Sequence, residues 1–278
     1  MKLHANAKIN LCLDVVKKRS DGYHEMDMIM TPLHLHDTLW IEPSDEEQYA
    51  CNNQDLVFDE HNTIVKAVKL MRETYHLKDF CKIRLEKRIP MEAGLAGGSA
   101  DAAAVLRYFQ KQYELPCTLE ELASLGKQIG ADVPFCVLNK LALVQGIGER
   151  LTPCAADCSF SVLLIKPKEG ISTKEAFHKL DFSACAHPDT ANALHAFMCN
   201  DRNAFYRYAG NTLEYSAFQM MPKLAEIKKE LYAYGFPFVL MSGSGSTIFA
   251  LCEKDEIVVK AANHFKDRYP FVCATKTM

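Results

Sequence analysis

The strongest constraint on the fold is a strict alternation of residue types near the N-terminus. Every odd position from Leu3 to Val15 is apolar, and the even positions are polar or charged apart from Cys12. A period of two places successive side chains on opposite faces of a β-strand. The sequence therefore predicts a half-buried strand over 3–15, with Asn6, Lys8 and Asn10 on its polar face.

The rest of the chain mixes strand and helix patterns without strict alternation between them. Strands are expected at 33–41, 82–89, 160–165, 238–241 and 247–252, and helices at 62–75, about 100–113, 118–130, from 172, and 222–232. Two of the helices start with capping-box spacing, Thr118 with Glu121 and Ser172 with Glu175. This mixture predicts an α+β fold. A length of 278 residues suggests two domains, divided near Thr152.

Composition narrows the class of function. The formal net charge of −3 gives no global bias toward nucleic acid or a membrane surface. The 11 cysteines are odd in number and form no C-x-x-C pair, which indicates a reducing compartment rather than a disulfide framework or a zinc site. No signal peptide or membrane span is recognisable. We therefore expect a cytoplasmic protein with no bound metal of its own and no nucleic-acid or membrane partner.

The segment from Gly94 to Ser99 is the clearest candidate for a ligand site. Its glycines let the backbone approach a ligand closely, and the helix that follows presents unpaired N–H groups at its start. Together these features suit phosphate oxygens, although a flexible loop before a helix remains the alternative. The run from Ser242 to Ser246 is either a hairpin turn or a second glycine loop near the same phosphates.

Four further residues have both a functional and an ordinary interpretation. Lys8, between two asparagines on one strand face, could bind a hydroxyl or phosphate or simply be solvated. Asp132 could cap a helix or, if paired with a cation, act as a general base. Tyr23 and His24 could bind a planar ring or pack in a core.

The order of these blocks resembles that in the kinase superfamily named for galactose, homoserine, mevalonate and phosphomevalonate kinases, the GHMP kinases. The shared features are an N-terminal strand with a lysine, the loop from Pro90 to Ser99 and the late loop Met241 to Thr247. Within it, the chain is similar to the erythritol-kinase branch, and the residues that indicate this are Ala7-Lys8-Ile9-Asn10-Leu11, Asp21-Gly22-Tyr23-His24, Gly130-Ala131-Asp132-Val133-Pro134-Phe135 and Gly148-Glu149-Arg150-Leu151.

The resemblance implies two lobes and a reaction. Residues 1–152 would form a ribosomal-protein-S5-domain-2-like lobe that binds nucleotide, and residues 153–278 a ferredoxin-like C-terminal lobe. The implied reaction is phosphorylation by ATP of the 2-hydroxyl of 4-diphosphocytidyl-2-C-methyl-D-erythritol, a step of the non-mevalonate route to isoprenoid precursors. ATP would be accompanied by Mg²⁺, which is held mainly by phosphates and water.

The resemblance also implies roles for individual residues. Asp132 would accept the hydroxyl proton, and Lys8 would pair with it and stabilise the phosphoryl charge. Asn10 would hold the polyol, Tyr23 and Phe177 would sandwich the cytosine, and His24 would hydrogen-bond its edge. The nucleotide would be bound by Asn62, Pro90, Gly94, Leu95, Ala96, Gly97, Gly98, Ser99 and Ala100.

The chain departs from the pattern of this branch at several positions. Glu92, Ala96 and the pair Asn139-Lys140 stand where glycine is common, Ala100 where serine is common, and Ser246 where proline or alanine is common. Two alternatives therefore stay open. One is another small-molecule kinase of the superfamily, and the other is a nucleotide-binding regulator that has lost catalysis.

Overall fold

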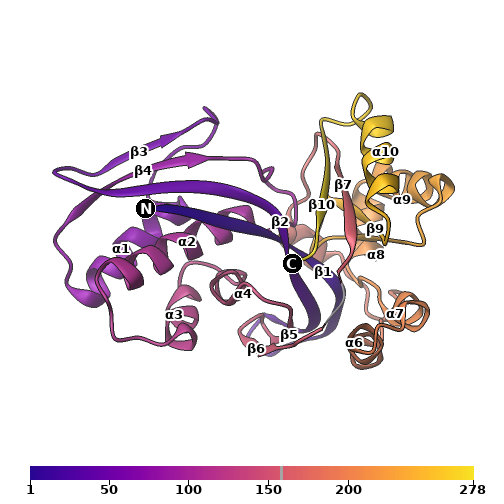
Figure 1. The fold of residues 1–278 in the computed structure, drawn as a ribbon. Helices are drawn as coiled ribbons and strands as arrows, with labels where there is room; N and C mark the ends of the chain where they lie inside the picture. The colour runs from indigo at the N-terminus through magenta and orange to yellow at the C-terminus, as the bar shows by residue number, and fades with distance from the viewer. Residues whose placement is uncertain (157–158) are drawn as a thin grey trace. The chain divides into compact units, whose positions relative to one another are not determined.

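The computed structural model describes residues 1–156 and 159–278 (Figure 1). The chain forms two compact units whose residues interleave. Unit 1 comprises Met1–Ala7, Leu35–Pro90 and Ala96–Asn139, and unit 2 comprises Lys8–His34, Met91–Leu95 and Lys140–Met278. Two long paired strands, β1 (Lys2–Lys18) and β2 (His24–Ser44), supply residues to both. The expected domain division after residue 152 stays a prediction.

Unit 1 combines a sheet with a group of helices. Its central strand β4 (Phe80–Glu86) pairs antiparallel with the end of β2 and parallel with β3 (Gln48–Cys51). Helix α2 (Gly97–Gln112) contacts α1 (Thr63–Tyr75), α3 (Leu119–Gly126) and α4 (Val133–Leu138). The buried positions of α2 are rich in alanine, and short side chains let neighbouring helices approach closely.

The helix ends follow the capping signals of the sequence. The Thr118 capping box is present with both of its hydrogen bonds, and Asn62 caps α1 by accepting the N–H of Ile64. The helix expected to run to Gly130 instead ends at Gly126, because residues 127–130 tighten into turns. In these turns the Gln128 N–H donates to the carbonyl of Leu125, three residues earlier.

Unit 2 contains a sheet in the strand order β10-β7-β9-β8, against which α9 and α10 pack (Figure 1). Strand β7 is buried along its whole length, as its uninterrupted apolar run predicts. A second group of strands, β5 and β6, extends from residues 26–30 of β2. The bounds of the elements are β5 (Ala142–Gly146), β6 (Arg150–Pro153), β7 (Ser161–Lys166), α5 (Thr173–His178), α6 (Thr190–Met198), α7 (Arg202–Tyr208), α8 (Glu214–Met220), α9 (Pro222–Tyr234), β8 (Phe238–Met241), β9 (Ile248–Cys252), α10 (Asp255–Phe265) and β10 (Phe271–Lys276).

The N-terminal strand is present as predicted, but the prediction that it is half-buried is wrong. All residues from Ala7 to Leu13 are buried, including those on the polar face. One reason is that unit 2 adds a distant segment to the strand: Leu13 donates its N–H to Gly210 O at 2.8 Å and accepts the N–H of Thr212 at 3.0 Å. The alternation correctly identified the two faces, but it carried no information about what covers the polar one.

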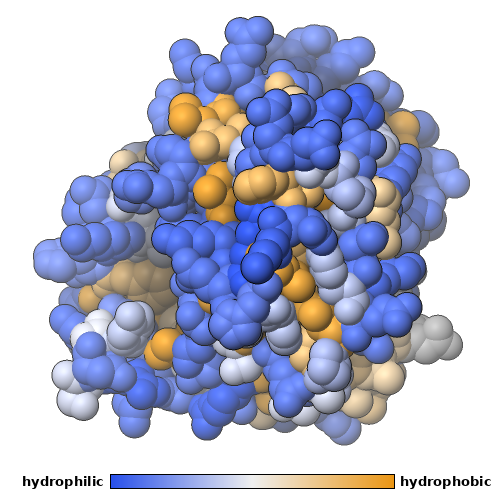
Figure 2. Space-filling view, turned by 90° about the vertical axis from the view of Figure 1, so that its left-hand side faces the viewer, coloured by the Kyte–Doolittle hydropathy of each residue, from blue (hydrophilic) through white to orange (hydrophobic). Residues whose placement is uncertain are grey.

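The surface is mostly hydrophilic on the face seen in Figure 2, with apolar residues scattered over it. Among the helices of the described residues, none combines the length and apolar character needed to cross a bilayer. The cysteines within those residues are free thiols.

Candidate functional site

Lys8 and Asn10 lie side by side in the interior of unit 2. Lys8 is only 3% exposed and Asn10 only 1%. The Lys8 ammonium donates to Asn10 Oδ1 at 2.8 Å, and Asn10 Nδ2 donates to the sulfur of Met28 at 3.3 Å. Burying an ammonium is costly unless it is hydrogen-bonded or paired with charge. The polar face of β1 is therefore buried and hydrogen-bonded at Lys8 and Asn10, and it is not a solvated surface.

The two glycine-containing loops meet directly in unit 2. Gly94 has a φ of +69°, and a Cβ there would lie 2.1 Å from Ser242 O and 2.9 Å from Gly245 O. Ser242 Oγ donates to Gly94 O at 2.9 Å, and the Thr247 N–H donates to Ala93 O at 3.3 Å. The late loop connects β8 to β9 as a hairpin, and it also packs on the first loop.

Lys8 belongs to the same cluster. Its backbone N–H donates to Leu95 O at 3.1 Å. Its ammonium nitrogen lies 3.3 Å from the position that a Cβ on Gly243 would occupy. Three segments far apart in the sequence, carrying Lys8, Gly94 and Gly243, are thus brought together in unit 2.

Asn211 supports this cluster and was missed by the sequence analysis. Its buried amide donates to Met241 O and to Gly243 O, both at 2.8 Å, and accepts the Leu213 N–H at 2.9 Å. These bonds fix the carbonyls at the start of the late loop. An asparagine without a recognisable neighbouring motif gave no signal in the sequence.

The start of α2 in unit 1 has the geometry of an anion site. Its N-cap residue is Ala96, which has no polar side chain and makes no capping bond. Gly98 is exposed, and its carbonyl accepts from Thr63 Oγ1 at 2.7 Å, which ties α2 to α1. Backbone N–H groups without a capping side chain suit phosphate oxygens.

Asn62 uses its amide within unit 1. Besides capping α1, its Nδ2 donates to Val57 O at 2.8 Å. It therefore fixes the start of the helix whose next residue, Thr63, bonds Gly98. Direct contact of Asn62 with a nucleotide stays a prediction.

Asp132 lies at the N-cap of α4, half-buried, and its side chain makes no capping bond. The turn before it lies against the start of α2, since a Cβ on Gly130 would be 3.9 Å from Ser99 Oγ. The helix-cap interpretation therefore does not explain this carboxylate. Asp132 belongs to unit 1 and Lys8 to unit 2, and their ion pair stays a prediction.

Aromatic rings in unit 2 gather around His24. Its ring centroid is 4.8 Å from that of Phe177 and 6.2 Å from that of Phe182, while Tyr23 is 60% exposed. Burial, with a smaller contribution from Lys18, lowers the pKa of His24, so the ring is neutral at pH 7. Phe182 was missed by the sequence analysis, because a lone aromatic in a loop carries no motif. The predicted sandwich of a base between Tyr23 and Phe177 stays a prediction.

Three of the positions that depart from the kinase pattern share a backbone conformation. Glu92, Ala96 and Asn139 have φ values of 50°, 56° and 50°. In this left-handed region a Cβ costs about 1–2 kcal/mol, and glycine does not incur that cost. The preference for glycine at these positions thus has a backbone cause, and this chain adopts the same conformation without glycine.

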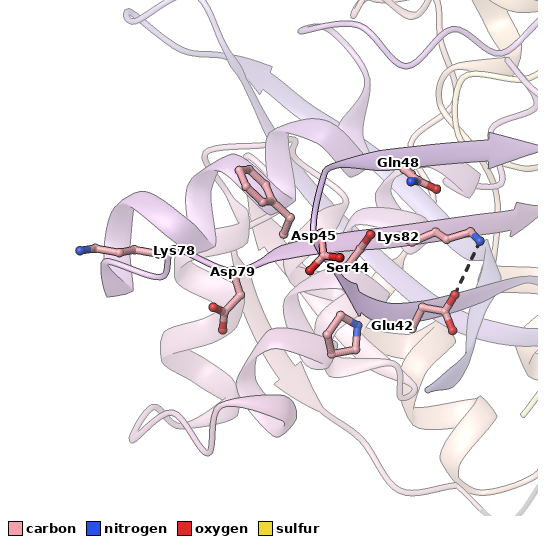
Figure 3. Close-up of a pocket in the computed structure, with 9 residues that line it drawn as sticks. Glu42, Ser44, Asp45, Gln48, Lys78, Asp79 and Lys82 are labelled. Carbon is pink, nitrogen blue, oxygen red and sulfur yellow. Dashed lines mark ion pairs between the residues drawn. The ribbon is translucent and has the colours of Figure 1, made fainter.

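A hollow of about 700 Å³ elsewhere in unit 1 contains none of the candidate residues (Figure 3). Its lining mixes the carboxylates Glu42, Asp45 and Asp79 with Lys78 and Lys82, and Lys82 pairs with Glu42 at 3.8 Å. This excess of carboxylates does not suit phosphate. Within the described ranges, no group of three His, Cys, Asp or Glu side chains has the arrangement of a metal site.

Comparison with known proteins places this geometry among kinases. Models of the GHMP kinase N-terminal and C-terminal domains match residues 62–140 and 190–270. The chain is 41% identical to 4-diphosphocytidyl-2-C-methyl-D-erythritol kinase of Geobacillus sp. (strain WCH70) over 261 residues, which are 93% of this chain and 90% of that protein. It is 38% identical to the same kinase of Clostridium tetani (strain Massachusetts / E88) over 280 residues, which span both chains fully.

Solved structures agree with these sequence matches. A crystal structure of 4-(cytidine 5'-diphospho)-2C-methyl-D-erythritol kinase superimposes with a TM-score of 0.86 at 32% identity, over 100% of this chain and 99% of that one. A homoserine kinase from Cytophaga hutchinsonii has a TM-score of 0.77 at 17% identity, over 100% of this chain and 94% of that one, and shares the fold. The α+β assignment and the two-domain kinase fold are confirmed.

We predict that Gly94→Ala is strongly destabilising. The substitution adds about 1–2 kcal/mol of left-handed backbone strain and a further cost of about 1–3 kcal/mol for forcing Ser242 away. Gly22→Ala is the matched control, since Gly22 has a φ of +86° with nothing within 4 Å of its would-be Cβ. Urea unfolding of the two variants measures the difference, and equal losses would contradict the close contact.

We predict that Ala96→Gly raises the free energy of unfolding by about 0.5–1 kcal/mol. The substitution removes left-handed strain at the start of α2. Part of this gain is lost, because glycine increases the conformational entropy of the unfolded chain. Ala103→Gly in the middle of the same helix should instead lower it by about 1 kcal/mol or more. Denaturant melts of both variants test this. Destabilisation by Ala96→Gly would show that the backbone strain is absent.

Proposed function

The chain belongs to the GHMP kinases, in the family of 4-diphosphocytidyl-2-C-methyl-D-erythritol kinases, and we propose that it transfers the γ-phosphoryl group of ATP to the 2-hydroxyl of 4-diphosphocytidyl-2-C-methyl-D-erythritol. The observation that carries the site assignment is the contact of Gly94 with the Ser242–Gly245 turn beside the buried Lys8. This contact joins the proposed phosphate loop to the late loop, beside the lysine of the N-terminal strand.

The reaction needs one proton acceptor and strong charge stabilisation. As the oxygen–phosphorus bond to the substrate hydroxyl forms and the bond to the ADP oxygen breaks, the hydroxyl proton passes to the Asp132 carboxylate. Lys8 stabilises the negative charge on the phosphoryl oxygens, with backbone N–H groups at the start of α2. Phosphoryl transfer depends mainly on positioning and electrostatics, so these groups are sufficient.

Substrate recognition is assigned to the residues around β1 and His24. Asn10 is held by Lys8 and Met28, and its amide retains hydrogen-bonding capacity for a polyol hydroxyl. The neutral His24 can both donate to and accept from a cytosine edge, while Tyr23 and Phe177 offer faces for stacking. The exposed Tyr23 is free to move onto a base when it binds.

Mg²⁺ would enter with ATP. The described residues contain no cluster of three ligating side chains, so the ion would be held by phosphate oxygens and water. It would neutralise charge on the phosphates. The free thiols support the proposal that the enzyme works in the reducing cytoplasm.

We predict that Asp132→Asn lowers single-turnover phosphoryl transfer by about 10²–10⁴-fold and leaves nucleotide binding nearly unchanged, because an amide keeps the shape but cannot accept the proton. Lys8→Ala should cost a similar factor, and the two losses should not add in the double variant. The measurement uses saturating ATP and the cytidyl erythritol substrate. Asp201→Asn, at the N-cap of α7, is the matched control and should keep full turnover.

Two outcomes would contradict this assignment. Near-normal turnover by Asp132→Asn would show that another group is the base. Strictly additive losses would show that Lys8 and Asp132 act independently. Failure of the unaltered protein to consume ATP with this substrate, while it still binds nucleotide, would favour a regulator that has lost catalysis.

We also predict that cytidine diphosphate raises the melting temperature much more than uridine diphosphate does. A ligand at a hundredfold excess over its dissociation constant stabilises the folded state by about 2.7 kcal/mol. His24 distinguishes the two bases only through the base edge, so His24→Ala should reduce the difference. Equal shifts for both nucleotides in the unaltered protein would remove the cytosine-specific part of the proposal.

A further inference from the structure

Three charged side chains of unit 1 meet in the protein interior. Lys87 Nζ lies 2.5 Å from Asp37 Oδ2 and 2.6 Å from Asp101 Oδ2. Asp37 is 0% exposed and Asp101 is 2% exposed. Removing one partner of such a buried group leaves an uncompensated charge, so the three residues act as one unit. We refer to them as the Asp37–Lys87–Asp101 cluster.

The cluster touches the segments on both sides of the glycine loop. Before the loop, Asp37 Oδ1 accepts the backbone N–H groups of Arg88 at 2.5 Å and Ile89 at 2.8 Å, so it fixes the residues that lead into Pro90. At the end of the loop, where α2 begins, a Cβ on Gly97 would lie 3.0 Å from Lys87 Nζ, and Asp101 belongs to the second turn of α2. Lys87 therefore lies directly against the first residue of the helix that follows the loop.

The charge of the cluster is unbalanced. When both acids are ionised there is one more carboxylate than ammonium, and Asp101 Oδ1 makes no hydrogen bond with any described residue. Burial raises the pKa of Asp101 to about 7, against the opposing effect of Lys87 and with a smaller contribution from Asp37. These are the charged groups that act on Asp101 from the neighbouring segments.

We propose that the Asp37–Lys87–Asp101 cluster holds the phosphate-binding loop in position, and that the charge on Asp101 modulates the affinity of the start of α2 for phosphate. The inference rests on the proposed binding of ATP at this loop. A phosphate at the start of α2 and an ionised Asp101 one turn later repel each other. Binding of nucleotide and uptake of a proton by Asp101 therefore favour each other, by reciprocal linkage.

The first test replaces Lys87 by methionine, which keeps its length and removes its charge. Lys87→Met should weaken ATP binding by about tenfold, the size of a typical site-to-site coupling, and change cytidine diphosphate binding by less than twofold. Lys82→Met, on strand β4 in the exposed pair with Glu42, is the control and should leave both affinities unchanged. Isothermal titration with each nucleotide gives the two affinities.

Unchanged ATP affinity in Lys87→Met would overturn the positioning role, and so would an equal loss for both nucleotides, which would indicate general destabilisation. If the unaltered protein bound cytidine diphosphate but no ATP, the proposed function would fail, and this inference with it.

The second test uses Asp101→Asn, which keeps the shape and an acceptor for Lys87 but cannot ionise. Between pH 6 and pH 8, the ATP affinity of the unaltered protein should fall about three- to tenfold more than that of Asp101→Asn, as expected for a coupled group titrating near pH 7. Titration of ATP itself is common to both proteins and cancels in the ratio. A purely structural role would shift the two pH profiles by a constant factor, and parallel profiles would overturn the proposed dependence on charge.

Discussion

The contact between Gly94 and the Ser242–Gly245 turn is the constraint on which the functional part of unit 2 depends. The Ser242 carbonyl occupies the space that any side chain at residue 94 would need. Ser242 Oγ and the Thr247 N–H then lock the two loops together, and Asn211 holds the carbonyls of the late loop in place. Because backbone packs directly on backbone here, the two loops can shift little relative to each other. Lys8, which is bonded to Leu95, therefore lies in one position beside both loops.

In both units, buried charged side chains fix the positions of neighbouring groups more than they stabilise the fold. Lys8 in unit 2 donates to Asn10 on its own strand, and Lys87 in unit 1 donates to Asp37 and Asp101 on two other segments. Replacing such groups with apolar residues would often be neutral for stability, whereas breaking one of them is costly. Exposed pairs such as Arg19 with Asp21 are worth little by comparison. These buried charged groups are thus found where the chain must hold a loop or an ammonium group in one geometry.

Local patterns predicted much of the fold because their causes are local. Alternation located β1, the Thr118 capping box located α3, and the glycine runs located both loops. The burial of Lys8 and Asn10 could not be predicted, because their neighbours Leu95, Gly243 and Met28 come from other segments of the chain. Asn211 and Phe182 escaped notice because neither belongs to a recognisable motif. The Asp37–Lys87–Asp101 cluster joins residues 50 and 14 positions apart, and each of its members alone resembles a solvated charge.

The pairing of β1 with residues 210–212 also bears on how the protein is made. Leu13 is synthesised about 200 residues before its partners Gly210 and Thr212, and Met278 likewise donates its N–H to the distant Pro32 O. At about 5–20 residues per second, a ribosome needs roughly 10–40 s to cover that distance. During this interval the backbone N–H and carbonyl of Leu13 lack the partners that they have in the folded protein. This part of unit 2 can form only after residues 210–212 have been synthesised, so β1 waits for a partner that lies about 200 residues further along the chain.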